Sequence, residues 1–179
     1  MTEQLFFDTD CLSSFLWVGQ EQLLLQLYPG KIVLPKQVLD ELSHPSIRHI
    51  GAKIESLQQA GKIVRSDILL NTEEYKLYYK LAISPSKGCR LIGKGEAAAL
   101  ALAKINNGII ASNNLKDISD YVSAFGLEHI TTGDIMKLAL EKGLIDENGG
   151  NQIWQEMIRR KRLLPTATFT EFLKQPDQI

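Results

Sequence analysis

Residues 93–121, GKGEAAALALAKINNGIIASNNLKDISDY, predict a helix, a strand and a second helix in succession. The alanines after Glu96 favour a helix that lies close against a sheet, because small side chains permit a near approach. Gly108 precedes the apolar run 109–111, which predicts a short buried strand. Polar residues follow directly, before the second helix. Such groups at the carboxyl end of a buried strand lie where open α/β sheets hold their active sites.

The rest of the chain repeats this alternation of short apolar and amphipathic segments. Strands are predicted at residues 4–7, 31–34, 63–64, 109–111 and 128–130. Helices are predicted at residues 11–28 (one or two), 36–43, 47–60, 72–83, 96–105, 131–143 and 151–161, and a last one opens with the Thr168–Glu171 capping box. Strands that alternate with helices indicate a mostly parallel sheet covered on both faces. We therefore predict a three-layer α/β/α fold.

Length and composition limit the class of protein. A chain of 179 residues suits one domain, here residues 1–142, with a helical extension at 143–179 packed on it. No apolar run approaches the ~20 residues that a membrane helix needs. The first ten residues carry acids where a signal peptide carries Lys or Arg. Cys11 and Cys89 form no CxxC motif. We expect a soluble cytoplasmic protein that binds no membrane.

Five polar side chains at the ends of separate elements are predicted to meet at the carboxyl edge of the sheet. They are Asp8, Glu41, Glu96, Asn114 and Asp117. Like charges within ~4–6 Å raise one another's pKa and oppose folding, so four clustered carboxylates need a cation among them. Oxygen ligands without His or Cys favour Mg²⁺ or Mn²⁺ over zinc. The sequence thus predicts a metal site that cleaves a phosphodiester.

Each of these residues also has a purely structural interpretation. Asp8 follows a strand and suits the N-cap of the next helix. Glu41 lies mid-helix, where a solvated face is the ordinary place for a carboxylate. Glu96 complements the macrodipole at a helix start. Asn114 and Asp117, three residues apart, have the spacing of an N-cap and its capping-box partner.

The segments that carry the acids resemble the successive motifs of PIN-domain ribonucleases. These segments are Asp8-Thr-Asp10-Cys-Leu, Glu41 in a helix after a proline, Gly95-Glu96-Ala-Ala-Ala-Leu, and Ser112-Asn-Asn114-Leu-Lys-Asp117. The last is similar to the T-x-N-x-x-D-F segment of VapC-type toxins, with Ser112 in place of Thr and Ile118 in place of Phe. Glu96 stands where many relatives carry Asp. The resemblance covers residues 4 to about 142, and the tail looks like an extension of a prokaryotic PIN subgroup.

The resemblance implies metal-dependent hydrolysis of single-stranded RNA. Asp8, Glu96 and Asp117 would be the ligands of one or two Mg²⁺ or Mn²⁺ ions, and Glu41 would complete the site. Asn114 would orient Asp117 or a metal-bound water. A toxin of this kind implies an antitoxin partner, and PIN-domain toxins are commonly dimers, so a homodimer is expected as well.

Two other classes of function are weighed against the nuclease. A haloacid-dehalogenase-like phosphatase also begins with a strand and D-x-D, as at Asp8 and Asp10, but Leu12 stands where that family has Thr or Val. A catalytically silent PIN-fold interaction protein is the second alternative, because a fold alone does not define a function. The set of acids argues against it, since unused like charges are costly to keep together.

Charge and apolar load give two further expectations. Lys and Arg number 20 against 21 acids, which suits brief contact with RNA better than tight DNA binding. The basic run 159–162 predicts contacts with RNA phosphates, although a basic helix end that complements the dipole is equally consistent. The apolar residues of segment 11–60 predict an exposed patch for self-association, or else a helix buried on several sides.

Overall fold

The computed structural model describes residues 3–84 and 90–176, so Cys89 and most of the predicted loop at 84–88 lie outside the described residues. Within these ranges, five strands form one sheet in the order β3-β2-β1-β4-β5. All neighbouring strands are parallel. The strands are β1 Leu5–Phe7, β2 Ile32–Pro35, β3 Val64–Ser66, β4 Ile109–Ala111 and β5 His129–Ile130. The predicted α/β class is confirmed.

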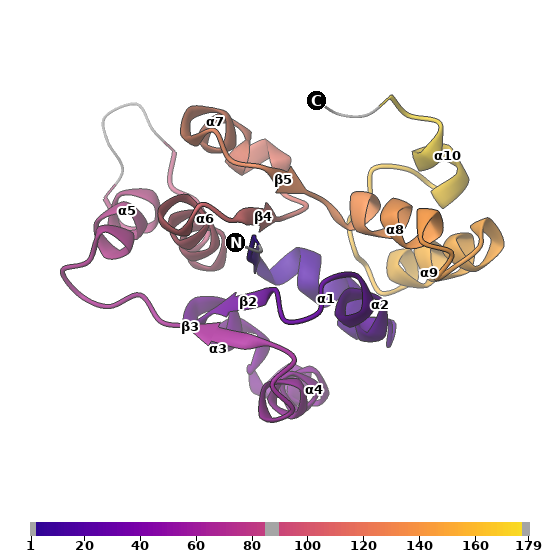
Figure 1. The fold of residues 1–179 in the computed structure, drawn as a ribbon, viewed down its shortest axis with the longest axis horizontal. Helices are drawn as coiled ribbons and strands as arrows, with labels where there is room; N and C mark the ends of the chain where they lie inside the picture. Colours follow the sequence, from indigo (N-terminus) through magenta and orange to yellow (C-terminus); the bar gives the residue numbers. More distant parts are fainter. Residues whose placement is uncertain (1–2, 85–89, 177–179) are drawn as a thin grey trace.

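Helices cover both faces of the sheet (Figure 1). They are α1 Thr9–Trp17, α2 Glu21–Leu27, α3 Lys36–Leu42, the 3-10 turn η1 Pro45–Ile47, α4 Arg48–Gln59, α5 Glu73–Ala82, α6 Lys94–Asn106, α7 Leu115–Phe125, α8 Thr132–Glu141, α9 Glu147–Arg159 and α10 Phe169–Leu173. Gly19 separates α1 from α2 with a φ of 69°, a left-handed conformation that glycine adopts without strain. Segment 11–28 is therefore two helices.

The alternation of side chains along β1 creates two hydrophobic cores. Leu5 and Phe7 point into the core formed with α1–α4 and α8–α10, whereas Phe6 points into the core formed with α5–α7. This follows from the two-residue period of a strand. The alanine-rich α6 lies on the Phe6 side, where Ala97, Ala99 and Ala103 are fully buried. The prediction that small side chains let this helix lie close on the sheet agrees with that packing.

The chain reverses its direction across the sheet between β1 and β4. It runs outward from β1 to β2 and β3, then returns to place β4 and β5 on the other side of β1. Such a topological switch point opens a crevice at the carboxyl ends of the two central strands. Asp8 follows β1 and Ser112 follows β4, so both lie at this point.

The C-terminal helices α9 and α10 gather beside α8 at one side of the molecule (Figure 1). Trp154 and Phe169 are fully buried in the same core as Leu5 and Phe7. A Cβ added at Gly150 would lie 2.4 Å from the Phe169 ring, and one at Gly133 would lie 2.3 Å from the Phe172 ring. The extension thus packs closely on the helices before it, while the division at residue 142 stays a prediction.

One expectation about the helices was wrong. Helix α9 begins at Glu147 and not at residue 151, because Asp146 caps it by accepting the Gly149 N–H at 2.6 Å. Of the two alternatives for segment 11–60, the structure favours helices buried on several sides. Its seven large side chains are buried or partly buried against the core: Phe15, Leu16, Trp17, Val18, Leu23, Leu24 and Leu25.

Across residues 3–84 and 90–176, no helix combines the length and apolarity required to cross a membrane.

Candidate active site

Asp8 is the most deeply buried of the predicted acids, with 1% of its surface exposed. Its Oδ1 accepts the Cys11 N–H at 2.7 Å, so the capping interpretation is correct for one oxygen. Its Oδ2 accepts a short hydrogen bond from the Ser112 hydroxyl, which follows β4. The Asp8 N–H donates to the Ala111 carbonyl at 3.0 Å. The carboxylate therefore joins the ends of the two central strands.

Burial makes the Asp8 carboxylate costly to ionise. The pKa of Asp8 is raised to about 7, chiefly by desolvation, although the donors Ser112 and Cys11 lower it. The nearby charges of Asp10 and Glu96 contribute to the rise. A helix cap alone does not need such an environment, because caps are usually solvated or satisfied at the surface. A buried carboxylate with other acids near it is typical of a functional site.

Asn114 connects Glu96 and Asp117. Its Nδ2 donates to Glu96 Oε1 at 2.6 Å and to Asp117 Oδ2 at 2.8 Å. Asn114 occupies the N-cap position of α7, yet its side chain makes no capping hydrogen bond. The interpretation of Asn114 and Asp117 as a capping box is therefore wrong. The amide instead holds two carboxylates from different helices together, which agrees with the predicted orienting role.

Glu96 is half-buried at the start of α6. Its second oxygen accepts the Gly93 N–H at 3.2 Å, so it also stabilises the helix start. Desolvation raises its pKa, while the hydrogen bonds from Asn114 and Gly93 lower it and the charges of Asp117 and Asp10 raise it. Asp117, with 25% of its side chain exposed, pairs through Oδ1 with the Arg90 guanidinium at 2.9 Å. This arginine partly compensates the acidic charge.

Glu41 is not merely a solvated residue of α3. Its two oxygens accept a short hydrogen bond from the Thr9 hydroxyl and the Gly95 N–H at 3.2 Å. A Cβ at Gly95 would lie 2.9 Å from Thr9 Oγ1 and 3.0 Å from Glu41 Oε2, so glycine gives the carboxylate room. Glu41 thereby connects α3 to the residue after Asp8 and to the residue before Glu96.

Asp10 differs from Asp8, Glu96 and Asp117 in its exposure to solvent, although its charge lies near Asp8 and Glu96. Its side chain is 61% exposed, and its nearest cation is Arg162, at 3.7 Å. Arg162 also donates to the Ser13 hydroxyl at 3.0 Å, which brings the end of the basic run to α1. Arg159 and Arg160 both pair with Glu156. The basic run therefore begins with two ion-paired residues at the end of α9.

The donor set suits a hard cation by its chemistry. Asp8, Glu96 and Asp117 supply carboxylate oxygens, which Mg²⁺ and Mn²⁺ prefer. Nearby acids contribute to the raised pKa values of Asp8 and Glu96, and a bound cation would relieve this repulsion. Within the described ranges, however, no three His, Cys, Asp or Glu side chains form a closed cluster ready to hold a metal. The ligand atoms are of the type that these metals prefer, and amide and hydroxyl donors hold the carboxylates in place.

Fold and site together define an α/β protein with a group of carboxylates at the switch point of a parallel sheet. A family model described as a PIN domain matches residues 4–178. The chain therefore belongs to this PIN-domain family, and the match includes the C-terminal helices as well as the sheet. PIN domains are generally nucleases and typically use divalent metal ions, which indicates a nuclease-type hydrolase. A search for similar curated proteins found no match.

Three residues that shape the site were not among the predicted site residues. Ser112 was treated only as a variant of the family's Thr, yet its hydroxyl contacts Asp8. Thr9 contacts Glu41, and His129 donates its Nε2–H to the Ser112 carbonyl at 2.8 Å. Their common signal is position, since Thr9 and Ser112 come after predicted strands and His129 lies within one. Hydroxyl and imidazole groups there are available to orient neighbouring carboxylates and backbone.

Proposed function

We propose that this PIN-domain protein is an Mg²⁺- or Mn²⁺-dependent endoribonuclease that hydrolyses phosphodiester bonds of single-stranded RNA. The observation that carries the proposal is the link made by Asn114 between Glu96 and Asp117, beside the buried Asp8. The four residues come from the ends of β1 and β4 and the starts of α6 and α7. Bringing these acids together costs stability, and a reaction that uses them best explains why they lie close to one another.

The side chains divide into those that would hold the metal and those that position them. Asp8, Glu96 and Asp117 would hold the ion, directly or through water. Ser112 and the Cys11 N–H fix the orientation of the Asp8 carboxylate, and Asn114 fixes those of the other two. When bound, the ion would supply Lewis-acid activation of a phosphate oxygen and a water of lowered pKa. Glu41 would complete the site from its place between Thr9 and Gly95.

The biological setting of the proposal rests on the resemblance to VapC-type toxins. It comprises a toxin role in the cytoplasm, an antitoxin protein as partner and a homodimer. The apolar side chains of segment 11–60 that had favoured the dimer are buried or partly buried, so the dimer rests on the resemblance. Light scattering tests the dimer directly, because a mass near 20 kDa at all concentrations would be the monomer. A reading frame for a small DNA-binding protein beside the gene would support the toxin role.

The substitution Asp8→Asn tests the metal mechanism, with Asp10→Asn as its matched control two residues away. Wild type should cleave single-stranded RNA with Mg²⁺ or Mn²⁺ and not with EDTA. Asp8→Asn should abolish cleavage while the protein stays folded, since Asn and Asp rank alike as N-caps. Asp10→Asn removes an exposed carboxylate and should retain activity within a few-fold. RNA cleavage that survives both EDTA and Asp8→Asn would overturn the proposal.

The same assays separate the nuclease from the other two functions. Hydrolysis of small phosphate monoesters without action on RNA would favour the phosphatase. A folded wild type that binds Mn²⁺ weakly and cleaves neither substrate would favour the silent interaction protein.

The basic run supplies a separate test of RNA binding. Replacing residues 159–162 with Gln should weaken RNA binding and reduce its salt dependence by roughly one unit for each phosphate that the protein no longer neutralises. Because Arg159 and Arg160 are paired with Glu156, we expect a smaller reduction than four phosphate-bound side chains would give. An unchanged salt slope would leave the run as a helix end only.

A further inference from the structure

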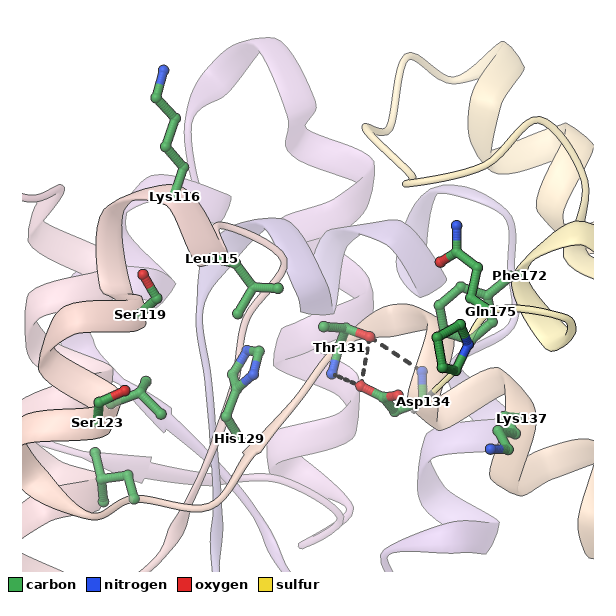
Figure 2. Close-up of a pocket in the computed structure, with 13 residues that line it drawn as sticks. Leu115, Lys116, Ser119, Ser123, His129, Thr131, Asp134, Lys137, Phe172 and Gln175 are labelled. Carbon is green, nitrogen blue, oxygen red and sulfur yellow. Dashed lines mark hydrogen bonds between the residues drawn. The ribbon is translucent and has the colours of Figure 1, made fainter. Parts of the chain in front are cut away.

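A cavity of about 540 Å³ lies between α7 and α8, with the last described residues of the chain along one side. Figure 2 shows Leu115, Ser119 and Ser123 of α7 on one side of this space, with Thr131 and Phe172 across from them. His129, the first residue of the edge strand β5, lies between the two sides. The volume lies in the range of ordinary small-ligand sites. None of the functions assigned to the acids uses this cavity.

A short chain of hydrogen bonds links the lining of the cavity to the acid site. His129, which lines the cavity, donates to the Ser112 carbonyl at 2.8 Å, and the Ser112 hydroxyl donates to Asp8. Leu115 and Lys116 line the cavity as the first two residues of α7, directly after Asn114. Because the lining begins directly after Asn114, the nucleotide next to a phosphate held by the carboxylates is the natural candidate for this cavity.

The lining combines an apolar wall with hydrogen-bonding groups. The wall is formed by Leu115, Val122, Leu127 and Phe172, and the polar groups include the hydroxyls of Ser119, Ser123 and Thr131. A nucleobase needs this combination, because its faces are apolar and its edges carry donors and acceptors. Single-stranded RNA offers such unstacked bases, whereas paired bases have their edges occupied.

The charges favour a nucleotide over a basic peptide. Asp134 is the one carboxylate of the described residues that line the cavity, and it accepts hydrogen bonds from the N–H and hydroxyl of Thr131 at 2.8 and 2.7 Å. The other charged residues of the lining, Lys116 and Lys137, are cations. Such a rim suits the phosphates on either side of a bound base.

We propose that the α7–α8 cavity binds one unpaired base of the RNA, in the nucleotide next to the scissile phosphate. This inference rests on the proposed nuclease function for its biological meaning, but binding of a base is measurable without cleavage. The cavity would then contribute to the choice of cleavage position, because the base that it holds fixes which phosphate reaches the acids.

Ser119→Trp tests the proposal by filling the cavity, with Ala124→Trp as the matched control. Both residues are exposed on α7, but only Ser119 lines the cavity. The probes are uridine and adenosine monophosphates, added to the full-length protein in EDTA and followed by amide NMR. We expect shifts centred on residues of the lining. Ser119→Trp should weaken binding about tenfold or more, whereas Ala124→Trp should bind within twofold of wild type.

A control ligand and a second variant complete the test of base binding. Inorganic phosphate should not reproduce the shifts, and if it does, the cavity is an anion site and the base-binding proposal is overturned. Ser123→Trp provides a second blocking variant if Ser119→Trp does not fold. Absence of nucleotide shifts in the lining, or wild-type binding by both blocking variants, also overturns it. Nucleotide binding without any RNA cleavage would instead reject the nuclease function and leave the cavity's ligand as proposed.

Discussion

The acidic edge of the sheet and the aromatic cluster of the C-terminal helices are built on opposite energetic terms. At the acidic edge, burial and, to a smaller extent, neighbouring acids raise the pKa of Asp8 to about 7. In the aromatic cluster, the Trp154 ring lies 5.6 Å from that of Phe169 and 5.4 Å from that of Phe172, centroid to centroid. The first arrangement costs stability and the second supplies it. We therefore expect the extension to offset part of the cost of the site.

The largest effect is expected from Trp154→Ala in the aromatic cluster. Trp154 is fully buried, and its Nε1–H donates to the Thr166 carbonyl at 3.0 Å. Truncation of such a residue costs about 3–5 kcal/mol of unfolding free energy. Urea unfolding measures the loss, and Ile158→Ala, at 36% exposure on the same helix, is the control with a much smaller one. A loss below about 1 kcal/mol for Trp154→Ala would remove the extension as a source of stability.

Gly150→Ala should destabilise the protein although it lies inside helix α9. Alanine normally stabilises a helix by up to about 1 kcal/mol relative to glycine. Here its Cβ would lie 2.4 Å from the Phe169 ring, and such overpacking costs about 1–3 kcal/mol. Gly51→Ala is the matched control, because the nearest atoms to its Cβ would be 3.5 Å away. Thermal melting should therefore show opposite signs for the two substitutions, and equal signs would contradict the close packing.

Asp8→Asn should stabilise the metal-free protein at pH 8, on the order of 1–3 kcal/mol. The native pKa of Asp8 lies above its ordinary value, at about 7, so the native state is penalised as the pH rises from about 4 to 7. The gain from Asn should accordingly grow over that interval and level off above it. Urea unfolding in EDTA at pH 5 and pH 8 measures both values. A loss at pH 8 would mean that the carboxylate serves stability and not function.

Added metal extends this comparison between the acid site and the aromatic cluster. Binding to the native state raises its melting temperature by linkage. Wild type and Trp154→Ala should both show a rise with Mn²⁺, since the aromatic cluster holds no ligand, whereas Asp8→Asn should largely lose it. Equal rises in all three proteins would place the metal elsewhere.

The sequence predicted the fold well because periodicity and turn residues report local structure. The run 109–111 became β4 within its predicted bounds, and the Thr168–Glu171 capping box opens α10 as expected. The start of α9 was missed because Gly149 and Gly150 discourage a helix by propensity. In the structure their missing side chains permit contact with the Asp146 cap and the Phe169 ring, and tertiary packing decides the helix start.

The sequence predicted which residues form the site better than it predicted the contacts between them. Order and spacing singled out Asp8, Glu96, Asn114 and Asp117, which lie at one edge of the sheet. The roles of Ser112 and Thr9 depend on partners 104 and 32 residues away in the chain, which local patterns do not encode. Glu41 shows the same limit, because its position in α3 gave no indication of its contact with the start of α6.

The smallest effect is expected from His129→Gln, at the boundary between the acid site and the cavity. Burial lowers the pKa of His129, so the native state favours the neutral ring and the unfolded state binds protons first. Wild type should therefore lose stability as the pH falls through about 6.5, the ordinary histidine value. Gln retains an N–H donor for the Ser112 carbonyl but does not titrate. It should remove a few tenths of a kcal/mol from the loss of stability between pH 7 and pH 5.

Urea unfolding at several pH values measures the slope of stability against pH, with the exposed His44→Gln as the control. If His129→Gln instead steepens the slope, the imidazole is protonated in the native state, and its bond to Ser112 belongs to a charged group.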